Sequence, residues 1–212
     1  MLAILTAVAL ASVAFSSGVA AQETGCQVVL DAGHGGSDSG AVNSNGLKEK
    51  DVTLDVASRL KALLEERYTV CMTRIGDQTL SNNYRYAYAN ATGAQILVSI
   101  HMNGSTNPAT DYTTTLYGKW RKDKELAQTM FGKLSTLSAA DGTGNIATRT
   151  PYSFASGVLL KSDMPATIVE TVFITSDKEG KLLSEGGNGV RQQQIAGKLK
   201  AGIEEYLAAH QP

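Results

Sequence analysis

The order of apolar and polar residues along the chain predicts alternating helices and strands. Apolar positions recur every three to four residues in four segments, which predicts amphipathic helices at about 50–67, 80–91, 124–137 and 195–207. Short runs rich in apolar and β-branched residues predict strands at 27–30, 68–73, 95–100, 113–117, 158–160 and 167–174. This alternation predicts an α/β fold, a single-domain three-layer structure whose mainly parallel sheet of about six strands carries helices on both faces.

The length and the charge of the chain narrow the classes of protein to consider. The 212 residues suffice for one sizeable domain and are too few for two. Positive and negative side chains nearly cancel, which leaves a formal net charge of −1, and the chain has no polybasic run. We therefore expect neither a nucleic-acid partner nor attachment to anionic lipid.

The N-terminal segment has the pattern of an export signal. Met1–Phe15 is an apolar run without a charged side chain, too short for a membrane span, which needs about 20 apolar residues. Val19-Ala20-Ala21 then provides the small residues that a signal peptidase reads. We predict a signal peptide at 1–21 and one exported domain at 22–212 without a transmembrane segment. The alternative is a disordered or membrane-anchoring N-terminus.

Export changes what the two cysteines can do. Cys26 and Cys71 are the only cysteines, and each lies on or beside a predicted strand. In an oxidising compartment they can form a disulfide; otherwise they are two buried free thiols. We expect the disulfide, although the sequence leaves both states open.

Two of the three histidines follow predicted strands. His34 lies in a glycine-rich run after the first strand, and His101 comes directly after the strand at 95–100. Because open α/β sheets place their sites at the carboxyl ends of strands, these two imidazoles can converge. His210 is the third residue from the C-terminus, and we expect a solvated tail residue there.

Two glutamates can complete a site with these histidines. Glu49 stands at the start of the helix that follows the His34 loop, and Glu170 lies inside the very apolar strand at 167–174. Two imidazoles and a carboxylate with one open position form a usual catalytic zinc site, and a further carboxylate can act as the base. Each residue also has a structural alternative: a turn histidine, a glutamate at a helix N-terminus, or a buried glutamate paired with an arginine. The spacing alone therefore leaves a metal site open.

Four ordered segments carry a resemblance to a known family. They are Asp31-Ala32-Gly33-His34-Gly35-Gly36 followed by Glu49, Thr73-Arg74 followed by Arg85, Ser99-Ile100-His101 with Asn103, and Val169-Glu170-Thr171-Val172-Phe173-Ile174. In this order they resemble the motifs of the zinc-dependent N-acetylmuramoyl-L-alanine amidases of the Amidase_3 type. The resemblance covers about residues 27–207, nearly the whole exported chain.

The resemblance implies one zinc ion, Zn²⁺, held by His34, Glu49 and His101, with Glu170 as the catalytic carboxylate. The implied reaction is hydrolysis of the amide bond between N-acetylmuramic acid and L-alanine in peptidoglycan, by an exported enzyme in the periplasm or outside the cell. Arg85 is expected to support the fold or the site and not to touch the substrate. Two other functions stay open: an inactive cell-wall-binding protein, and an amidase restricted to released muropeptides.

Some members of this family carry a helix, between the third and fourth motifs, that blocks the zinc until a partner removes it. Residues 138–156 are rich in Gly, Ser and Thr and lack apolar periodicity, so they predict a loop beside the site and not a docked helix. We therefore predict an open site and a monomer that is active without an obligatory activator.

Overall fold

One six-stranded sheet forms the centre of the molecule. The structure, a computed structural model, describes residues 25–118, 121–184 and 189–211. The strands lie in the order β2-β1-β3-β6-β4-β5. They are β1 (Val28–Ala32), β2 (Val70–Met72), β3 (Ile96–Asn103), β4 (Thr114–Tyr117), β5 (Tyr152–Ser153) and β6 (Ala166–Phe173). The four strands β2, β1, β3 and β6 are parallel, whereas β4 runs antiparallel to β6 and parallel to β5. The predicted mainly parallel sheet is confirmed.

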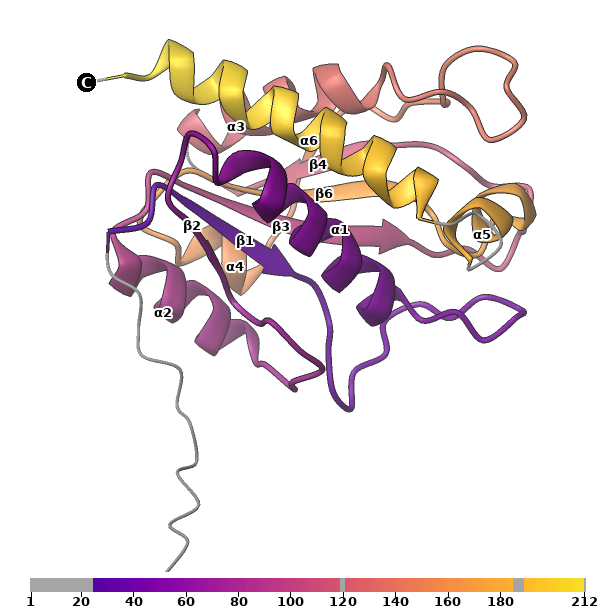
Figure 1. Cartoon of the computed structure of the whole chain (residues 1–212), viewed down its shortest axis with the longest axis horizontal. Coiled ribbons are helices and arrows are strands. Elements are labelled where there is room, and N and C mark those ends of the chain that lie inside the picture. The colour runs from indigo at the N-terminus through magenta and orange to yellow at the C-terminus, as the bar shows by residue number, and fades with distance from the viewer. Residues whose placement is uncertain (1–24, 119–120, 185–188, 212) are drawn as a thin grey trace, which may run out of the picture.

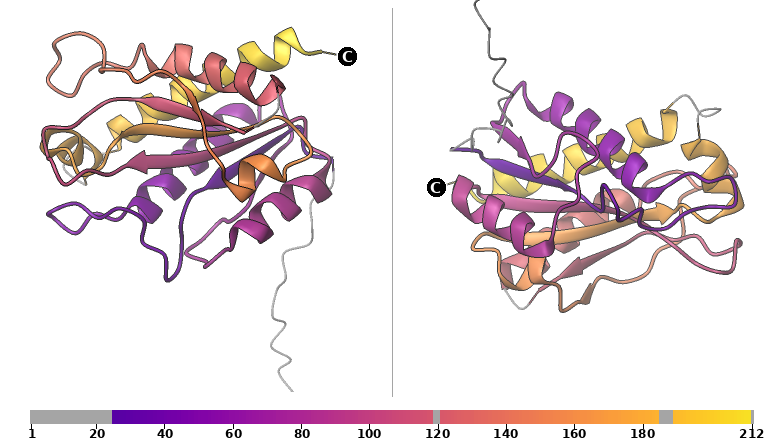
Figure 2. Two further views of the ribbon diagram at one scale, coloured as in Figure 1. Left: turned by 180° about the vertical axis from the view of Figure 1, so that it is seen from behind. Right: turned by 90° about the horizontal axis from the view of Figure 1, so that it is seen from below.

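Helices cover both faces of this sheet (Figures 1 and 2). The first face carries α1 (Glu49–Leu64), α3 (Arg121–Leu134) and α6 (Val190–Ala209), with α6 packed between the other two. The second face carries α2 (Asn82–Thr92) and the short α4 (Gly157–Leu160), which pack against each other. A further helix, α5 (Asp177–Leu183), follows β6. The predicted three-layer, single-domain arrangement is therefore confirmed.

The alternation of side chains along the strands creates two apolar cores. On β1 and β3, Leu30 and Val98 belong to the core under α1, α3 and α6. Their neighbours Val29 and Leu97 belong to the core under α2 and α4, because successive side chains of a strand point to opposite faces. This double burial explains why Ile96, Leu97 and Val98 form a continuous apolar run on β3.

Three short elements differ from the sequence expectation. The strand predicted at 158–160 is wrong, since these residues form α4, and the Ser156 hydroxyl caps that helix by accepting a hydrogen bond from the Val158 amide at 3.3 Å. A run of three apolar residues is too short to reveal its period. The two-residue strand β5 falls inside the predicted loop at 138–156, and α5 was not predicted, although Ser176 and Glu179 have the spacing of a helix-capping pair.

A disulfide joins Cys26 to Cys71. Cys26 lies two residues before the start of β1, and Cys71 lies on β2, in register with Val29. Both side chains are buried. The expected disulfide is thus confirmed, and the alternative of two free thiols is wrong.

Replacing both cysteines with serine is expected to lower the free energy of unfolding by about 2 to 4 kcal/mol, because the unfolded chain loses a covalent constraint on a long loop. Urea unfolding of the wild type and the double variant should measure this difference. A reducing agent should bring the wild type to the stability of the variant and leave the variant unchanged. Two free thiols in denatured, unreduced wild-type protein would contradict the prediction.

The described helices can be compared with the requirements of a membrane span. None of the helices among residues 25–118, 121–184 and 189–211 combines the length and the apolar character needed to cross a bilayer. The predicted signal peptide at 1–21 lies outside the described residues.

Candidate metal centre

Three donor side chains from separate elements meet at one point. His34 follows β1, His101 lies on β3, and Glu49 is the first residue of α1. Glu49 Oε1 lies 3.0 Å from His34 Nε2 and 3.1 Å from His101 Nδ1, and the two imidazole nitrogens are 3.1 Å apart. All three donor atoms lie within 4.8 Å of one another. The structure therefore brings together the three residues that the sequence predicted as ligands.

The glycines around His34 give the donors room to meet. His34 itself has a left-handed backbone, with φ of 60°, a conformation that costs energy for a non-glycine residue and occurs at functional sites. A Cβ atom on Gly33 would overlap the His101 ring, and a Cβ atom on Gly40 would overlap Glu49 and His34. Only glycine fits these two positions, which explains the glycine-rich run after the first strand.

Neighbouring groups hold the donors in their orientations. The Asp38 carboxylate lies 2.9 Å from His34 Nδ1, so it receives the hydrogen of the nitrogen that faces away from the cluster. Glu49 Oε1 accepts a hydrogen bond from the Met102 amide at 3.0 Å, and Oε2 accepts one from the Ala41 amide at 2.9 Å. Partners of this kind fix the tautomer and direction of metal-binding side chains.

Burial and charge together set the protonation of the cluster. Burial alone would lower the pKa of His34, but the hydrogen bonds and charges of Glu49 and Asp38 outweigh it and raise the pKa to about 9. Burial would likewise raise the pKa of Glu49, yet the two histidines lower it to about 2. The carboxylate is therefore ionised, and without a metal it attracts protons to the two imidazoles. A divalent cation would replace those protons.

Glu170 stands beside the donors on the next strand. In the sheet register it pairs with His101 of β3 on one side and with Thr114 of β4 on the other. Burial raises the pKa of the Glu170 carboxyl, and the neighbouring His101 opposes this rise. Within the described part of the chain, the buried Thr114 hydroxyl has no hydrogen-bond partner. Glu170 is thus a half-buried carboxyl group next to the three donors and not one of them.

A buried ion pair supports the loop that carries His34. Asp31 accepts hydrogen bonds from Arg85 Nη1, from Thr73 and from Ser99, each at 2.6 Å. Arg85 also donates to the Ala32 and His34 carbonyls, both at 2.8 Å. The expectation that Arg85 supports the fold or the site agrees with these contacts.

A cleft of about 350 Å³ opens beside the donors. Its lining includes His34, His101 and Glu170, and also Leu116 of β4 and Tyr152 of β5. Phe154 and Ser156 line it as well, which confirms that the segment predicted as a loop at 138–156 lies beside the site. The side chains of His34 and His101 are 22% and 21% exposed, so the donor cluster is accessible from this cleft.

The family model for N-acetylmuramoyl-L-alanine amidases of the Amidase_3 type matches residues 28–205. The chain belongs to the N-acetylmuramoyl-L-alanine amidase family. This match spans the four donor and carboxyl positions, all of which lie between residues 34 and 170.

Relatives of the amidase family agree with this assignment. The chain is 31% identical to the N-acetylmuramoyl-L-alanine amidase AmiC of Escherichia coli O6:H1, in an alignment that covers 90% of this chain and 55% of AmiC. It therefore spans little more than half the length of that relative. The structure resembles the N-acetylmuramoyl-L-alanine amidase AmiC2 of Nostoc punctiforme, with a TM-score of 0.75, 31% identity and coverage of 88% of this chain and 99% of that one.

A solved catalytic domain in the amidase family gives the same result. The catalytic domain of CwlV from Bacillus (Paenibacillus) polymyxa has a TM-score of 0.75 and 31% identity, with coverage of 86% of this chain and 98% of that domain. The α/β unit described above thus corresponds to an amidase catalytic domain over nearly its whole length.

Several residues of the site were not singled out by sequence reasoning. Asp38, the hydrogen-bond partner of His34, was not predicted as a site residue. Tyr152 and Phe154 were placed only within a loop. His210, expected to be a solvated tail residue, has a side chain that is 29% exposed; its ring also stacks on Tyr206 at 4.1 Å between centroids, and its Nε2 lies 3.3 Å from Glu125.

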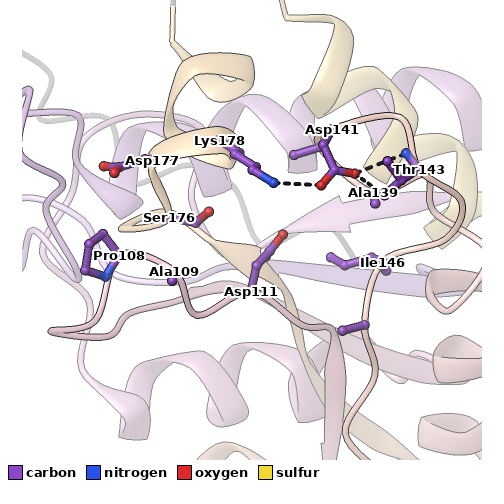
Figure 3. Close-up of a pocket in the computed structure, with 12 residues that line it drawn as sticks. Pro108, Ala109, Asp111, Ala139, Asp141, Thr143, Ile146, Ser176, Asp177 and Lys178 are labelled. Carbon is purple, nitrogen blue, oxygen red and sulfur yellow. Dashed lines mark hydrogen bonds and ion pairs between the residues drawn. The ribbon is translucent and has the colours of Figure 1, made fainter.

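A second cavity, of about 440 Å³, shares no lining residue with the cleft. Figure 3 shows that the Lys178 side chain of α5 points toward Asp141, which lies on a neighbouring loop. Lys178 Nζ donates a hydrogen bond to Asp141 Oδ2 at 2.6 Å. Asp141 also accepts a hydrogen bond from the backbone amide of Thr143 at 3.1 Å. The contact between Lys178 and Asp141 fixes the loop against α5, so these polar side chains have a structural role.

Proposed function

We propose that this chain hydrolyses the amide bond between N-acetylmuramic acid and L-alanine of peptidoglycan, with a zinc ion held by His34, Glu49 and His101 and with Glu170 as the catalytic base. The observation that carries the proposal is the convergence of those three donors beside the Glu170 carboxyl group, in a chain that belongs to the amidase family. Two imidazole nitrogens and one carboxylate oxygen are the donor set of many catalytic zinc sites.

The residues fit such an ion. The donors come from three separate elements and already point at one place, and Asp38 supports His34 from behind. A zinc ion bound there would polarise the scissile carbonyl group and bring the pKa of an attacking water close to 7.

Glu170 supplies the proton transfers in this proposal. Its carboxylate accepts a proton from the water as the oxygen bonds to the carbonyl carbon, and it then returns that proton to the nitrogen of L-alanine as the amide bond breaks. Burial raises the pKa of this carboxyl group, which makes it a better proton acceptor than an exposed glutamate. The products are a lactyl carboxylate on the sugar and a free amine on the peptide.

Digestion of purified sacculi by the chain alone tests the proposal. Mass spectrometry should find stem peptides with a free alanine amine and glycan with a free lactyl carboxyl group. A chelator should abolish this release, and zinc should restore it. Full activity of metal-free protein would contradict the metal proposal. A cell-wall-binding protein would release nothing, and an enzyme restricted to muropeptides would cleave only soluble fragments.

The same experiment tests independence from an activator and the monomeric state. The donors are accessible from the cleft, and this supports the proposal that the purified chain is active without a second protein. If stem peptides appear only after a partner is added, that proposal is wrong. Gel filtration of the active sample gives the oligomeric state.

Export follows from the same proposal. Peptidoglycan lies outside the cytoplasmic membrane, so an enzyme that cuts it acts in the periplasm or outside the cell. Residues 1–21 are proposed as the signal peptide that directs this export, with 22–212 as the amidase catalytic domain, and the disulfide of Cys26 and Cys71 is compatible with an oxidising compartment. Mass spectrometry of the secreted chain should find Gln22 at its N-terminus.

A further inference from the structure

An exposed arginine, Arg149, lies against Tyr152, one of the residues that line the cleft. The Arg149 guanidinium lies over the Tyr152 ring, 4.9 Å from its centroid, and Nη1 donates to the Tyr112 hydroxyl at 3.3 Å. The ring of Tyr152 lines the cleft together with His101 and Glu170. Among the described residues, no carboxylate forms an ion pair with Arg149. Its charge is therefore available to a ligand.

The backbone that carries Arg149 is held in place by the sheet. Its amide donates to the Thr113 carbonyl at 3.0 Å, and the Thr113 amide donates to the Ala147 carbonyl at 2.9 Å. Thr113 immediately precedes β4, so this pairing extends the contact between β4 and β5. Stacking on Tyr152 then restricts the side chain. An exposed arginine fixed in this way loses less conformational entropy when it binds an anion than a freely rotating one does.

The cleft runs across the sheet from the donors to Tyr152, on which Arg149 stacks. Its lining contains His101 of β3, Glu170 of β6, Leu116 of β4 and Tyr152 of β5, which is the order of these strands in the sheet. Adjacent strands are about 4.8 Å apart, so three spacings separate β3 from β5 by about 14 Å. An extended peptide covers about 3.5 Å per residue. A substrate bound at the donors therefore reaches the β5 end with about four residues.

We propose that Arg149, held on Tyr152, binds a carboxylate of the stem peptide beyond L-alanine and so selects substrates whose stem carboxyl groups are free. This inference rests on the proposed function. The two arms of the substrate differ in charge: the amide-linked glycan arm is neutral, whereas the stem peptide carries carboxylates unless they are amidated. A guanidinium without a carboxylate partner among the described residues, next to the β5 side of the cleft, matches the peptide arm, since arginine forms charge-assisted hydrogen bonds with carboxylates.

Kinetics on a matched pair of soluble N-acetylmuramoyl tetrapeptides tests this inference. One substrate has free stem carboxyl groups, and in the other they are amidated. Arg149→Gln should lower kcat/KM for the free substrate about tenfold, mainly through KM, because one charge-assisted hydrogen bond is lost. It should leave kcat/KM for the amidated substrate unchanged. Arg149→Lys should retain part of the preference, and Arg67→Gln, at an exposed arginine paired with Glu204, should change neither value.

The outcomes separate this inference from the proposed function. If the wild type cleaves both substrates and Arg149→Gln changes neither rate, the inference is wrong and the proposed function stands. An equal loss on both substrates would place Arg149 against the glycan arm or in a structural role, and would also overturn the inference. If the wild type cleaves neither these substrates nor sacculi, the proposed function fails and the inference falls with it.

Discussion

Replacement of Glu170 by glutamine is expected to lower kcat by about 10²- to 10⁴-fold, the usual contribution of a positioned acid–base group. The glutamine side chain keeps the shape of glutamate but cannot accept the proton of the attacking water. Glu170 pairs with His101 across the sheet yet lies outside the group of three converging donors. The metal should therefore stay bound, and the loss should appear in turnover alone.

Two measurements on the same sample check this expectation. Metal content is determined by elemental analysis of the purified variant, and kcat is measured on a soluble muramoyl peptide. Glu66→Gln, at an exposed glutamate after α1, provides a control that should match the wild type in both. Loss of the metal from Glu170→Gln would show that base and ligand have been confused. Undiminished turnover would remove Glu170 from the mechanism.

Asp31→Asn is expected to lower the free energy of unfolding by about 3 to 5 kcal/mol, because it leaves the Arg85 guanidinium buried without its counter-charge. Asp31 is fully buried and Arg85 is 4% exposed. Thr73 donates to Asp31 Oδ1 and Ser99 donates to Oδ2, so asparagine, which has a single oxygen, also leaves one of these two hydroxyls without its acceptor. Urea unfolding at neutral pH measures the difference. A change below about 1 kcal/mol would contradict this view of the pair.

The stabilisation that Asp31 contributes should decrease as the pH falls. Burial would raise the pKa of Asp31, but Arg85 and the hydrogen bonds from Ser99 and Thr73 lower it below its usual value. A carboxyl group whose pKa is lowered by folding stabilises the protein above its unfolded pKa, about 3.9, and loses this contribution as the pH falls through the folded value. The difference between wild type and variant should therefore shrink below about pH 4.

A surface pair of the same residue types provides the matched control for Asp31. Asp55 pairs with Arg59 on α1 at 2.8 Å, with side chains 38% and 33% exposed. Asp55→Asn should cost well under 1 kcal/mol, because solvent screens an exposed pair and its side chains lose entropy in forming it. An equal cost at Asp31 and Asp55 would show that burial does not set the contribution of the pair.

The long, strongly patterned elements could be predicted from the sequence, and the order of strands could not. The run at 95–100 is apolar on both faces because β3 is central, and its pattern shows this directly. Nothing in the local pattern places β6 between β3 and β4, since that position depends on contacts distant in sequence. The run at 158–160 was misassigned for the opposite reason, because a single turn of helix is too short to show a period.

The candidate site likewise contains residues that could be predicted from the sequence and residues that could not. His34, Glu49 and His101 could be selected because the motif residues and the glycines around them carry the information locally, and the structure brings them together. Zinc and the role of each residue stay predictions. Tyr152 and Arg149 could not be found from the sequence, because their loop lacks periodicity. Their place beside the cleft depends on pairing with β4.

The strand order has a consequence for a chain that is still being made or secreted. β3 and β4 follow one another in sequence, but β6 lies between them in the sheet. Neither β4 nor β5 can join the sheet until residues 166–173 arrive to fill that gap. A partly emerged chain thus has all three metal donors but neither a finished cleft nor Glu170. The proposed amidase activity is therefore expected only once the chain through β6 is present, since both Glu170 and the strand that pairs with β4 come with that segment.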